Sequence, residues 1–101
     1  MRVLITGVAG FIGSNLATRL VDEGDDVIGI DNLSAGVREN VDDRVSFHQA
    51  DIRSPAIYPL FQGVDAIFHL AAKNCLADCL EDPVETAAVN VTGTANVLEA
   101  A

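Results

Sequence analysis

Short apolar runs alternate with a helical pattern along the first third of the chain. Residues 2–6 form an apolar run that stops at Gly7, and a run of this length predicts a buried strand. Residues 11–23 then carry apolar side chains at helical spacing, which predicts an amphipathic helix. Residues 27–30 are again apolar, so they predict a second buried strand that ends at Asp31.

The middle of the chain predicts two further strands, with a loop and a short helical segment beside them. Residues 32–43 are polar and rich in turn formers, so they predict a loop or a broken helix. Residues 45–50 predict a third strand, and residues 66–70 predict a fourth. Residues 54–61 contain prolines and therefore predict no more than a turn or two of helix.

A helix start signal lies near the C-terminal end of the sequence. Asp82 suits the N-cap, Pro83 suits the first helical position, and Glu85 completes a capping box. The apolar residues that follow predict one helix face, made of Val84, Ala87, Ala88, Val91, Ala95 and Leu98. This face could pack on the sheet or meet a partner, and the sequence leaves both possibilities open.

The order of these elements predicts an α/β fold. Strands that are apolar throughout are typical of a parallel sheet that is covered by helices on both faces. Right-handed crossovers then give a doubly wound sheet with the strand order 3-2-1-4. In that order the fourth strand forms an unprotected apolar edge, so the predicted sheet is incomplete.

Composition and charge exclude several classes of function. The chain has 101 residues, of which 50% are hydrophobic and 21% charged, and this predicts one globular domain. No apolar run approaches the roughly 18 residues of a membrane span, and no signal peptide is visible, so we expect a cytoplasmic protein. A net charge of −9 repels nucleic acid and anionic membranes, so we expect neither as a partner.

The strongest chemical motif is the glycine pattern between the first strand and the first helix. Gly7 permits a tight turn, Gly10 lets the backbone approach a pyrophosphate, and Gly13 lets the helix pack closely on the strand. Free N–H groups and the helix dipole favour phosphate at such a turn. Taken alone, the pattern is equally consistent with three turn-forming residues and no ligand.

Two aspartates follow strands at positions that suit a dinucleotide. Asp31 ends the second strand about 20 residues after the glycines, where an acid binds the adenosine ribose hydroxyls. Its charge would repel a 2′-phosphate, so the sequence favours NAD over NADP. Asp51 follows the third strand and could reach the adenine edge, with Ile52 against the ring, or it could simply cap a turn.

The cysteines and histidines carry weaker signals. Cys75 and Cys79 are spaced like one helix face, which allows a metal or redox pair but fits two small apolar side chains better. We therefore expect no metal site. We expect His69, inside the fourth strand, to be buried with one nitrogen hydrogen bonded, and His48 to face solvent, with no catalytic role for either residue.

Several separated motifs together resemble one family over the whole chain. They are the glycine turn, Asp31-Asn32-Leu33-Ser34, Asp51-Ile52, His69-Leu70-Ala71-Ala72, and Asp82-Pro83 followed by Asn90-Val91-Thr92-Gly93-Thr94. The sequence resembles the N-terminal part of an extended short-chain dehydrogenase/reductase of the NAD-dependent epimerase/dehydratase family of nucleotide sugars. The resemblance implies a Rossmann-type NAD-binding domain, of which residues 1–101 would form the N-terminal part.

The resemblance also implies which residues contact the adenosine half of NAD. The pyrophosphate would lie along Phe11 and Ile12. The adenosine ribose and the nearby phosphate would be held by Asp31, Asn32, Ser34 and Gly36. Adenine would be flanked by Asp51 and Ile52.

On the nicotinamide side, the resemblance implies contacts from two segments. The cofactor would be lined past the fourth strand by Leu70, Ala71 and Ala72, and Asn90 would face it from the last helix. Family members often carry a cofactor-binding lysine at the position that Asn74 occupies here. The role of Lys73, the only lysine, therefore stays open.

The catalytic pair of the family does not occur in these residues. The family uses a Tyr-x-x-x-Lys pair, in which the lysine lowers the pKa of the tyrosine so that the phenolate can act as a base. The one tyrosine, Tyr58, is followed four residues later by Gln62. We therefore assign no catalytic residue and expect weak or no turnover by this chain alone.

Three interpretations remain open at the level of the sequence. The chain could be the leading part of a longer nucleotide-sugar epimerase or dehydratase, in which a hydride moves between the sugar and bound NAD. It could be a short, non-catalytic NAD-binding or nucleotide-binding module that covers its sheet edge by forming a homo-oligomer. It could also be an inert remnant that does not fold alone. A nucleotide-sugar partner is expected only in the first case.

Overall fold

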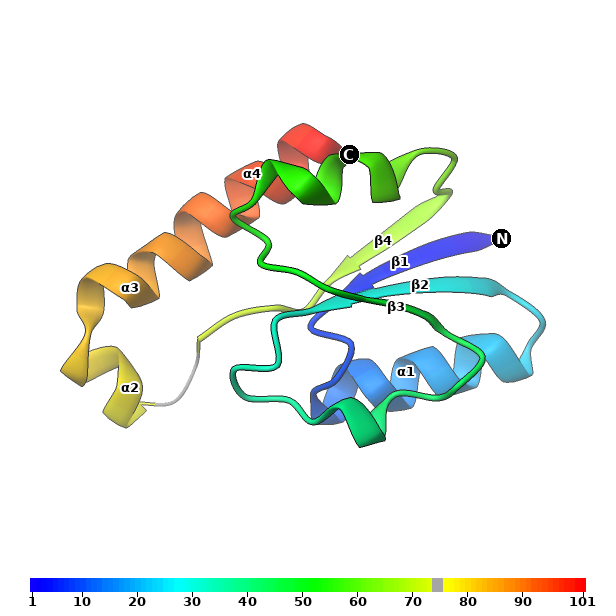
Figure 1. The fold of residues 1–101 in the computed structure, drawn as a ribbon, viewed down its shortest axis with the longest axis horizontal. Coiled ribbons are helices and arrows are strands. Elements are labelled where there is room, and N and C mark those ends of the chain that lie inside the picture. The colour runs from blue at the N-terminus through cyan, green and yellow to red at the C-terminus, as the bar shows by residue number, and fades with distance from the viewer. Residues whose placement is uncertain (74–75) are drawn as a thin grey trace.

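The computed structural model describes residues 1–73 and 76–101, whose strands form a parallel sheet. The strands are β1 (Arg2–Thr6), β2 (Asp26–Asp31), β3 (Ser46–Gln49) and β4 (Ala66–His69). They lie side by side in the order β3-β2-β1-β4 (Figure 1). The predicted fold class and strand order are therefore confirmed, and each strand lies within about one residue of its predicted bounds.

Apolar side chains of the strands alternate between the two faces of the sheet and build two cores. Ile5 packs on one face with α1 (Phe11–Asp22), whereas Leu4 packs on the other face with η2 (Pro55–Phe61) and α4 (Gly93–Ala100). Figure 1 shows α1 on one side of the strands, and α4 with the green helical segment η2 on the opposite side. This burial on both faces explains why the strands are apolar at nearly every position.

A helical run follows β4 at the C-terminal end of the chain. It consists of α3 (Pro83–Ala87), the π-helical turn η3 (Ala88–Thr92) and α4, and a short helix, α2 (Leu76–Glu81), precedes it. The predicted N-cap is confirmed, because the Asp82 carboxylate accepts a hydrogen bond from the N–H of Glu85 at 3.0 Å. In the described parts of the chain, no helix has the length and apolar character needed to cross a membrane.

The apolar face that the sequence predicts for the last helix does not pack on the sheet, which was one of the two possibilities left open. Solvent covers most of the surface of Val84, Val91 and Leu98. The face that packs on the sheet instead contains Gly93 and Val97, and a Cβ at Gly93 would lie 2.5 Å from the Ile52 side chain. The helix carries two apolar stripes of similar spacing. The sheet takes the stripe with the small residue, because only a glycine lets the backbone approach this closely.

Within the described residues, β4 is an edge strand of the sheet. It pairs with β1 on one side, and the order of the sheet ends there. Phe68, on this strand, is 40% exposed. The predicted unprotected apolar edge is therefore present in the structure.

Candidate functional site

A cavity of about 570 Å³ lies beside the residues that end β1 and β2 and follow β4. In a parallel sheet, the loops that leave neighbouring strands meet at this edge, and ligands bind there. The cavity brings together segments that are far apart in the sequence. Among the predicted site residues, its walls include Gly7, Gly10, Phe11, Ile12, Gly13, Asp31, Asn32, Ser34, Gly36, Asp51, Ile52, Leu70, Ala71 and Ala72.

Some wall residues were not among the predicted contacts. They are Ile30, Ala35, Lys73, Glu85 and Val89. Glu85 and Val89 were missed because the sequence pattern did not show which side of the last helix faces the sheet. Ala35 and Lys73 are chain neighbours of predicted residues, so adjacency in the sequence was a signal that could have found them.

Asn90 is the predicted site residue that does not line the cavity. Its side-chain amide donates to the carbonyl oxygen of Lys73 at 2.9 Å, and its side-chain oxygen accepts from the N–H of Lys73 at 2.8 Å. The π-helical turn η3 presents Asn90 to this backbone segment. Asn90 therefore lies outside the cavity wall, and it holds Lys73, in the segment 70–73 that borders the cavity.

Close backbone contacts shape the glycine turn. Gly7 has a φ of +73°, and a Cβ there would lie 2.8 Å from the backbone nitrogen of Ala71. A Cβ at Gly13 would overlap the carbonyl oxygen of Gly7. In the described part of the chain, no side chain caps the start of α1, which begins at Phe11. The N–H groups of the first helical turn are therefore available to an anion.

Asp31 ties the end of β2 to the glycine turn. Its Oδ2 accepts from the N–H of Ala9 at 2.9 Å, and its Oδ1 accepts from the N–H of Leu33 at 2.8 Å. Leu33 has a φ of 63°, which is uncommon for a residue other than glycine, so this second bond supports a strained turn. Each carboxylate oxygen keeps a further lone pair, and these can accept from hydroxyl groups in the cavity.

Asp51 and Glu85 share one guanidinium group in the wall of the cavity. The Asp51 carboxylate accepts from Nε and Nη2 of Arg53, and Nη1 of Arg53 lies 3.0 Å from Oε1 of Glu85. The hydrogen bonds from Arg53 hold the pKa of Asp51 below its ordinary value, since they favour the carboxylate. The same bonds raise the pKa of Arg53.

His69 lies in a chain of hydrogen bonds that joins the sheet to the last helix. The Thr94 hydroxyl donates to the carbonyl of Asn90 at 2.6 Å, so it accepts from Nε2–H of His69 at 2.9 Å. The Thr6 hydroxyl accepts from the N–H groups of residues 70–71, so its proton points to Nδ1 of His69 at 2.6 Å. His69 is therefore neutral and partly buried with both nitrogens bonded, which corrects the expectation of a single bonded nitrogen.

Mild acid should destabilise the chain through His69. Burial lowers the pKa of His69 in the folded state below its ordinary value of 6.5, so the unfolded chain binds a proton more readily. The free energy of unfolding should therefore fall as the pH drops below about 6.5, and the loss should stop below the folded pKa. Urea unfolding between about pH 7.5 and 5.5 measures this, because carboxylates with lowered pKa values titrate below that range.

Two variants test whether His69 is the source of this pH dependence. His69→Gln removes the titrating ring, and the fall in stability over that range should become smaller. Thr94→Ser keeps the hydroxyl that accepts from Nε2–H, and the fall should persist. An unchanged fall in His69→Gln would show that another group is responsible.

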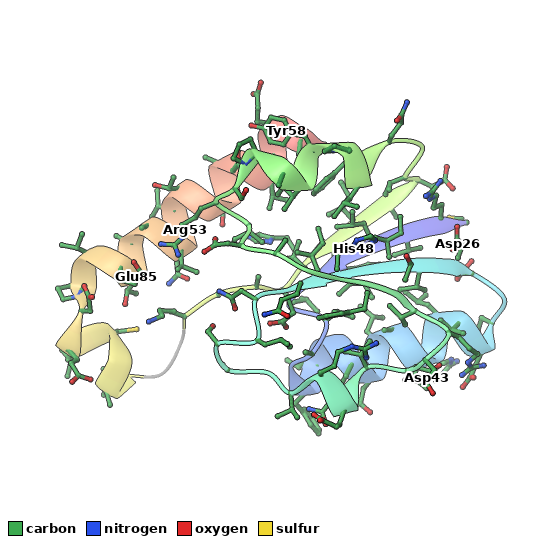
Figure 2. The ribbon with its side chains drawn as sticks, viewed as in Figure 1. Asp26, Asp43, His48, Arg53, Tyr58 and Glu85 are labelled. Carbon is green, nitrogen blue, oxygen red and sulfur yellow. The ribbon has the colours of Figure 1, made fainter. Side chains whose placement is uncertain are left out.

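Tyr58 is anchored away from the wall of the cavity. Its hydroxyl donates to Oδ1 of Asn96 at 2.7 Å, and the Asn96 amide donates to the carbonyl oxygens of Ile52 and Ser54. Figure 2 shows Tyr58 on η2, on the outer side of the helical layer. This hydroxyl therefore holds η2 against α4, and it has no lysine four residues further on.

The remaining cysteine and histidine predictions concern Cys75, Cys79 and His48. Cys75 lies outside the described residues, as does Asn74. The thiol of Cys79 donates a long hydrogen bond of 3.8 Å to the carbonyl of Lys73. His48, on β3, was expected to face solvent and is instead partly buried (Figure 2). Across residues 1–73 and 76–101, no group of three or more His, Cys, Asp or Glu side chains is placed to hold a metal ion.

Comparison with known proteins identifies relatives over the whole chain. The sequence model of the NAD-dependent epimerase/dehydratase family matches residues 3–101. The chain is 43% identical to a UDP-glucose 4-epimerase of Mycolicibacterium smegmatis, with 100% of this chain and 34% of that protein covered. It is 41% identical to UDP-glucuronic acid decarboxylase 2 of Arabidopsis thaliana, with 97% of this chain and 22% of that protein covered.

The fold of this chain also matches part of a solved structure. The chain matches the crystal structure of a UDP-glucose 4-epimerase from Thermus thermophilus in complex with NAD, with a TM-score of 0.90 and 41% identity. The match covers 99% of this chain and 33% of that chain. The sequence thus spans about a third, or less, of the length of these relatives.

Proposed function

The chain belongs to the NAD-dependent epimerase/dehydratase family, and on this premise we propose that its cavity binds NAD as part of an enzyme that acts on nucleotide sugars. One contact carries the proposal most directly. The Asp31 carboxylate accepts from the N–H of Ala9 at 2.9 Å, so a ribose acceptor and a phosphate-binding turn are held together as one unit. A single dinucleotide can contact both without rearranging either.

The walls of the cavity fit the successive parts of NAD. The first-turn N–H groups of α1 attract the pyrophosphate, and the free lone pairs of Asp31 accept from the adenosine ribose hydroxyls. When NAD is bound, Asp51 and Ile52 would border adenine, and residues 70–72 would border the nicotinamide ribose; all of these residues line the cavity. When bound, NAD supplies an acceptor for a hydride from a sugar carbon, and the residues of this chain hold it in position.

Two exposed apolar side chains at the mouth of the cavity support the same proposal. Phe11 and Ile12 are 84% and 68% exposed, although they begin the helix that follows the glycine turn. Exposure of a large apolar pair costs free energy unless something covers it. A dinucleotide along the pyrophosphate-binding turn would shield both side chains.

We expect the 101-residue chain to bind NAD without turning over a nucleotide sugar. Binding should be one to one by calorimetry, and NADP should bind more weakly because Asp31 repels a 2′-phosphate. Incubation with NAD and UDP-glucose or UDP-galactose should leave the sugars unchanged, since no Tyr-x-x-x-Lys pair is available to move the proton.

The outcomes of that experiment separate the competing interpretations. Interconversion of the two sugars by the purified chain would overturn the non-catalytic part of the proposal. A chain that melts cooperatively but does not bind NAD would overturn the cofactor assignment. A chain that neither melts cooperatively nor binds NAD would favour an inert remnant. Sedimentation of the same sample tests whether the chain forms the homo-oligomer considered for a short NAD-binding module, for which the apolar edge at β4 offers a surface.

A further inference from the structure

Ala9 lies between the glycines of the turn, and both polar groups of its backbone are hydrogen bonded. Its N–H donates to Oδ2 of Asp31 at 2.9 Å. Its carbonyl oxygen accepts from the N–H of Val37 at 3.2 Å and from the side-chain amide of Asn40, also at 3.2 Å. Ala9 is fully buried, and the cavity wall includes the glycines of the turn but not Ala9. Ala9 is therefore held by the protein and stays out of reach of a ligand.

These bonds join the glycine turn to both ends of the loop that follows β2. Asp31 begins this loop, and Asn40 is the last residue of the helical turn η1 (Arg38–Asn40). Between them, a Cβ at Gly36 would lie 2.7 Å from the carbonyl carbon and oxygen of Ala9. Figure 1 shows this segment, coloured from cyan to green, turning back beside the start of α1. The loop and the glycine turn therefore form one packed unit.

The peptide between Ala9 and Gly10 helps to set the shape of the turn. The N–H of Gly10 donates to the carbonyl oxygen of Gly7 at 3.2 Å, while the carbonyl oxygen of Ala9 accepts from the loop. A peptide next to glycine can rotate into conformations that other residues resist. Donors that hold the carbonyl oxygen oppose this rotation. A turn that is already ordered does not have to be ordered again when a ligand binds, and this favours affinity.

Two side chains of η1 fasten it to different parts of the fold. The Asn40 amide reaches the glycine turn, as described above. Arg38 instead stacks on the ring of Phe47, on β3, with its guanidinium 4.5 Å from the ring centre. Both Arg38 and Asn40 are exposed, and neither lines the cavity. Each can therefore be replaced without removing a group that faces the ligand.

We propose that Asn40 is a positioning residue that keeps the glycine turn in the shape that binds a pyrophosphate. It acts through the carbonyl oxygen of Ala9 and does not touch the ligand. The proposal rests on NAD binding as proposed above, and it adds a residue outside the cavity on which that binding depends. The effect should be confined to ligands that contact the glycine turn, because adenosine without phosphate does not extend to it.

The test compares ADP-ribose with adenosine in matched variants of η1. Both ligands carry the adenosine part, and only ADP-ribose carries the pyrophosphate. Asn40→Ala should lower the ratio of the two affinities roughly fivefold, through weaker binding of ADP-ribose, which is the effect of one neutral hydrogen bond. Arg38→Met removes the other side chain that fastens η1, and the ratio should stay at the value of the intact chain. Calorimetric titration measures both affinities.

A second variant keeps the test decisive. Asn40→Leu has a similar shape but no donor, so the ratio should fall as in Asn40→Ala, and this variant decides alone if Asn40→Ala does not melt cooperatively. An unchanged ratio would overturn the proposal, and so would an equal loss for both ligands, which is the mark of a general structural role. The same fall in Arg38→Met would also overturn it. An intact chain that binds ADP-ribose no more tightly than adenosine would instead overturn the proposed function.

Discussion

The Gly13→Ala variant should lose about 3 kcal/mol of stability and most of its affinity for NAD. A Cβ at this position would overlap the carbonyl oxygen of Gly7 and would lie 3.0 Å from Cα of Val8. Both obstacles belong to the backbone of the glycine turn, so no side-chain rotation can relieve the overlap. Either α1 moves away from β1 or the turn deforms, and each movement displaces the N–H groups that would bind phosphate.

Urea unfolding and NAD titration of the same variant measure both effects. Gly24→Ala is the matched control, because nothing lies within 4 Å of a Cβ at that glycine. Gly24 has a φ of +91°, so alanine there should still cost about 1 kcal/mol of backbone strain, with no loss of NAD affinity. If Gly13→Ala were no less stable than Gly24→Ala, the close contact between α1 and the glycine turn would not be essential.

The Asp31→Ala variant should bind NAD roughly tenfold to a hundredfold more weakly and should lose its preference over NADP. The change removes the acceptor for the ribose hydroxyls and the charge that repels a 2′-phosphate. It also leaves the N–H groups of Ala9 and Leu33 without their partner, so the loop after β2 and the glycine turn lose the connection between them. Calorimetric titration with NAD and NADP gives both affinities.

Two further variants identify which property of Asp31 matters. Asp31→Asn removes the charge but keeps one side-chain oxygen, so it should relax the discrimination against NADP more than it weakens NAD binding. Asp43→Ala removes a surface charge beside α1, outside the cavity wall, and controls for the change in net charge (Figure 2). Equal loss of preference in Asp43→Ala would mean that overall charge, and not the ribose contact, sets the selectivity.

Some residues of the candidate site can be predicted from the sequence, and others cannot. Gly7, Gly13 and Asp31 follow from local rules, because a turn, a close helix and a strand end each require a recognisable residue type. The structure brings them to one cavity, as the motif predicts. The sequence indicated Glu85 only as a helix-capping residue. Glu85 also lies in the cavity wall beside Arg53, and no local sequence pattern predicts this contact between distant segments.

Asn90 shows the opposite case, in which the sequence motif was recognised but the hydrogen bonds of the side chain within the chain were not predicted. The family resemblance implied a side chain that faces the cofactor, and in the structure both polar atoms of the amide bond to the backbone of Lys73. The π-helical turn decides this, because the wider turn changes which side chains point to the sheet. A pattern read at a constant helical period cannot contain that shift.

The sequence by itself determined the parallel α/β fold, the strand order and the glycine turn with its acid, because these depend on residues that are neighbours or follow a fixed period. Only the tertiary structure decided which stripe of the last helix is buried, since the helical pattern contains two apolar stripes and the close approach at Gly93 selects one. The tertiary structure alone also decided the salt bridge between Arg53 and Glu85 and the chain of hydrogen bonds through His69. Each joins side chains that are distant in sequence, and their pairing depends on how the layers dock.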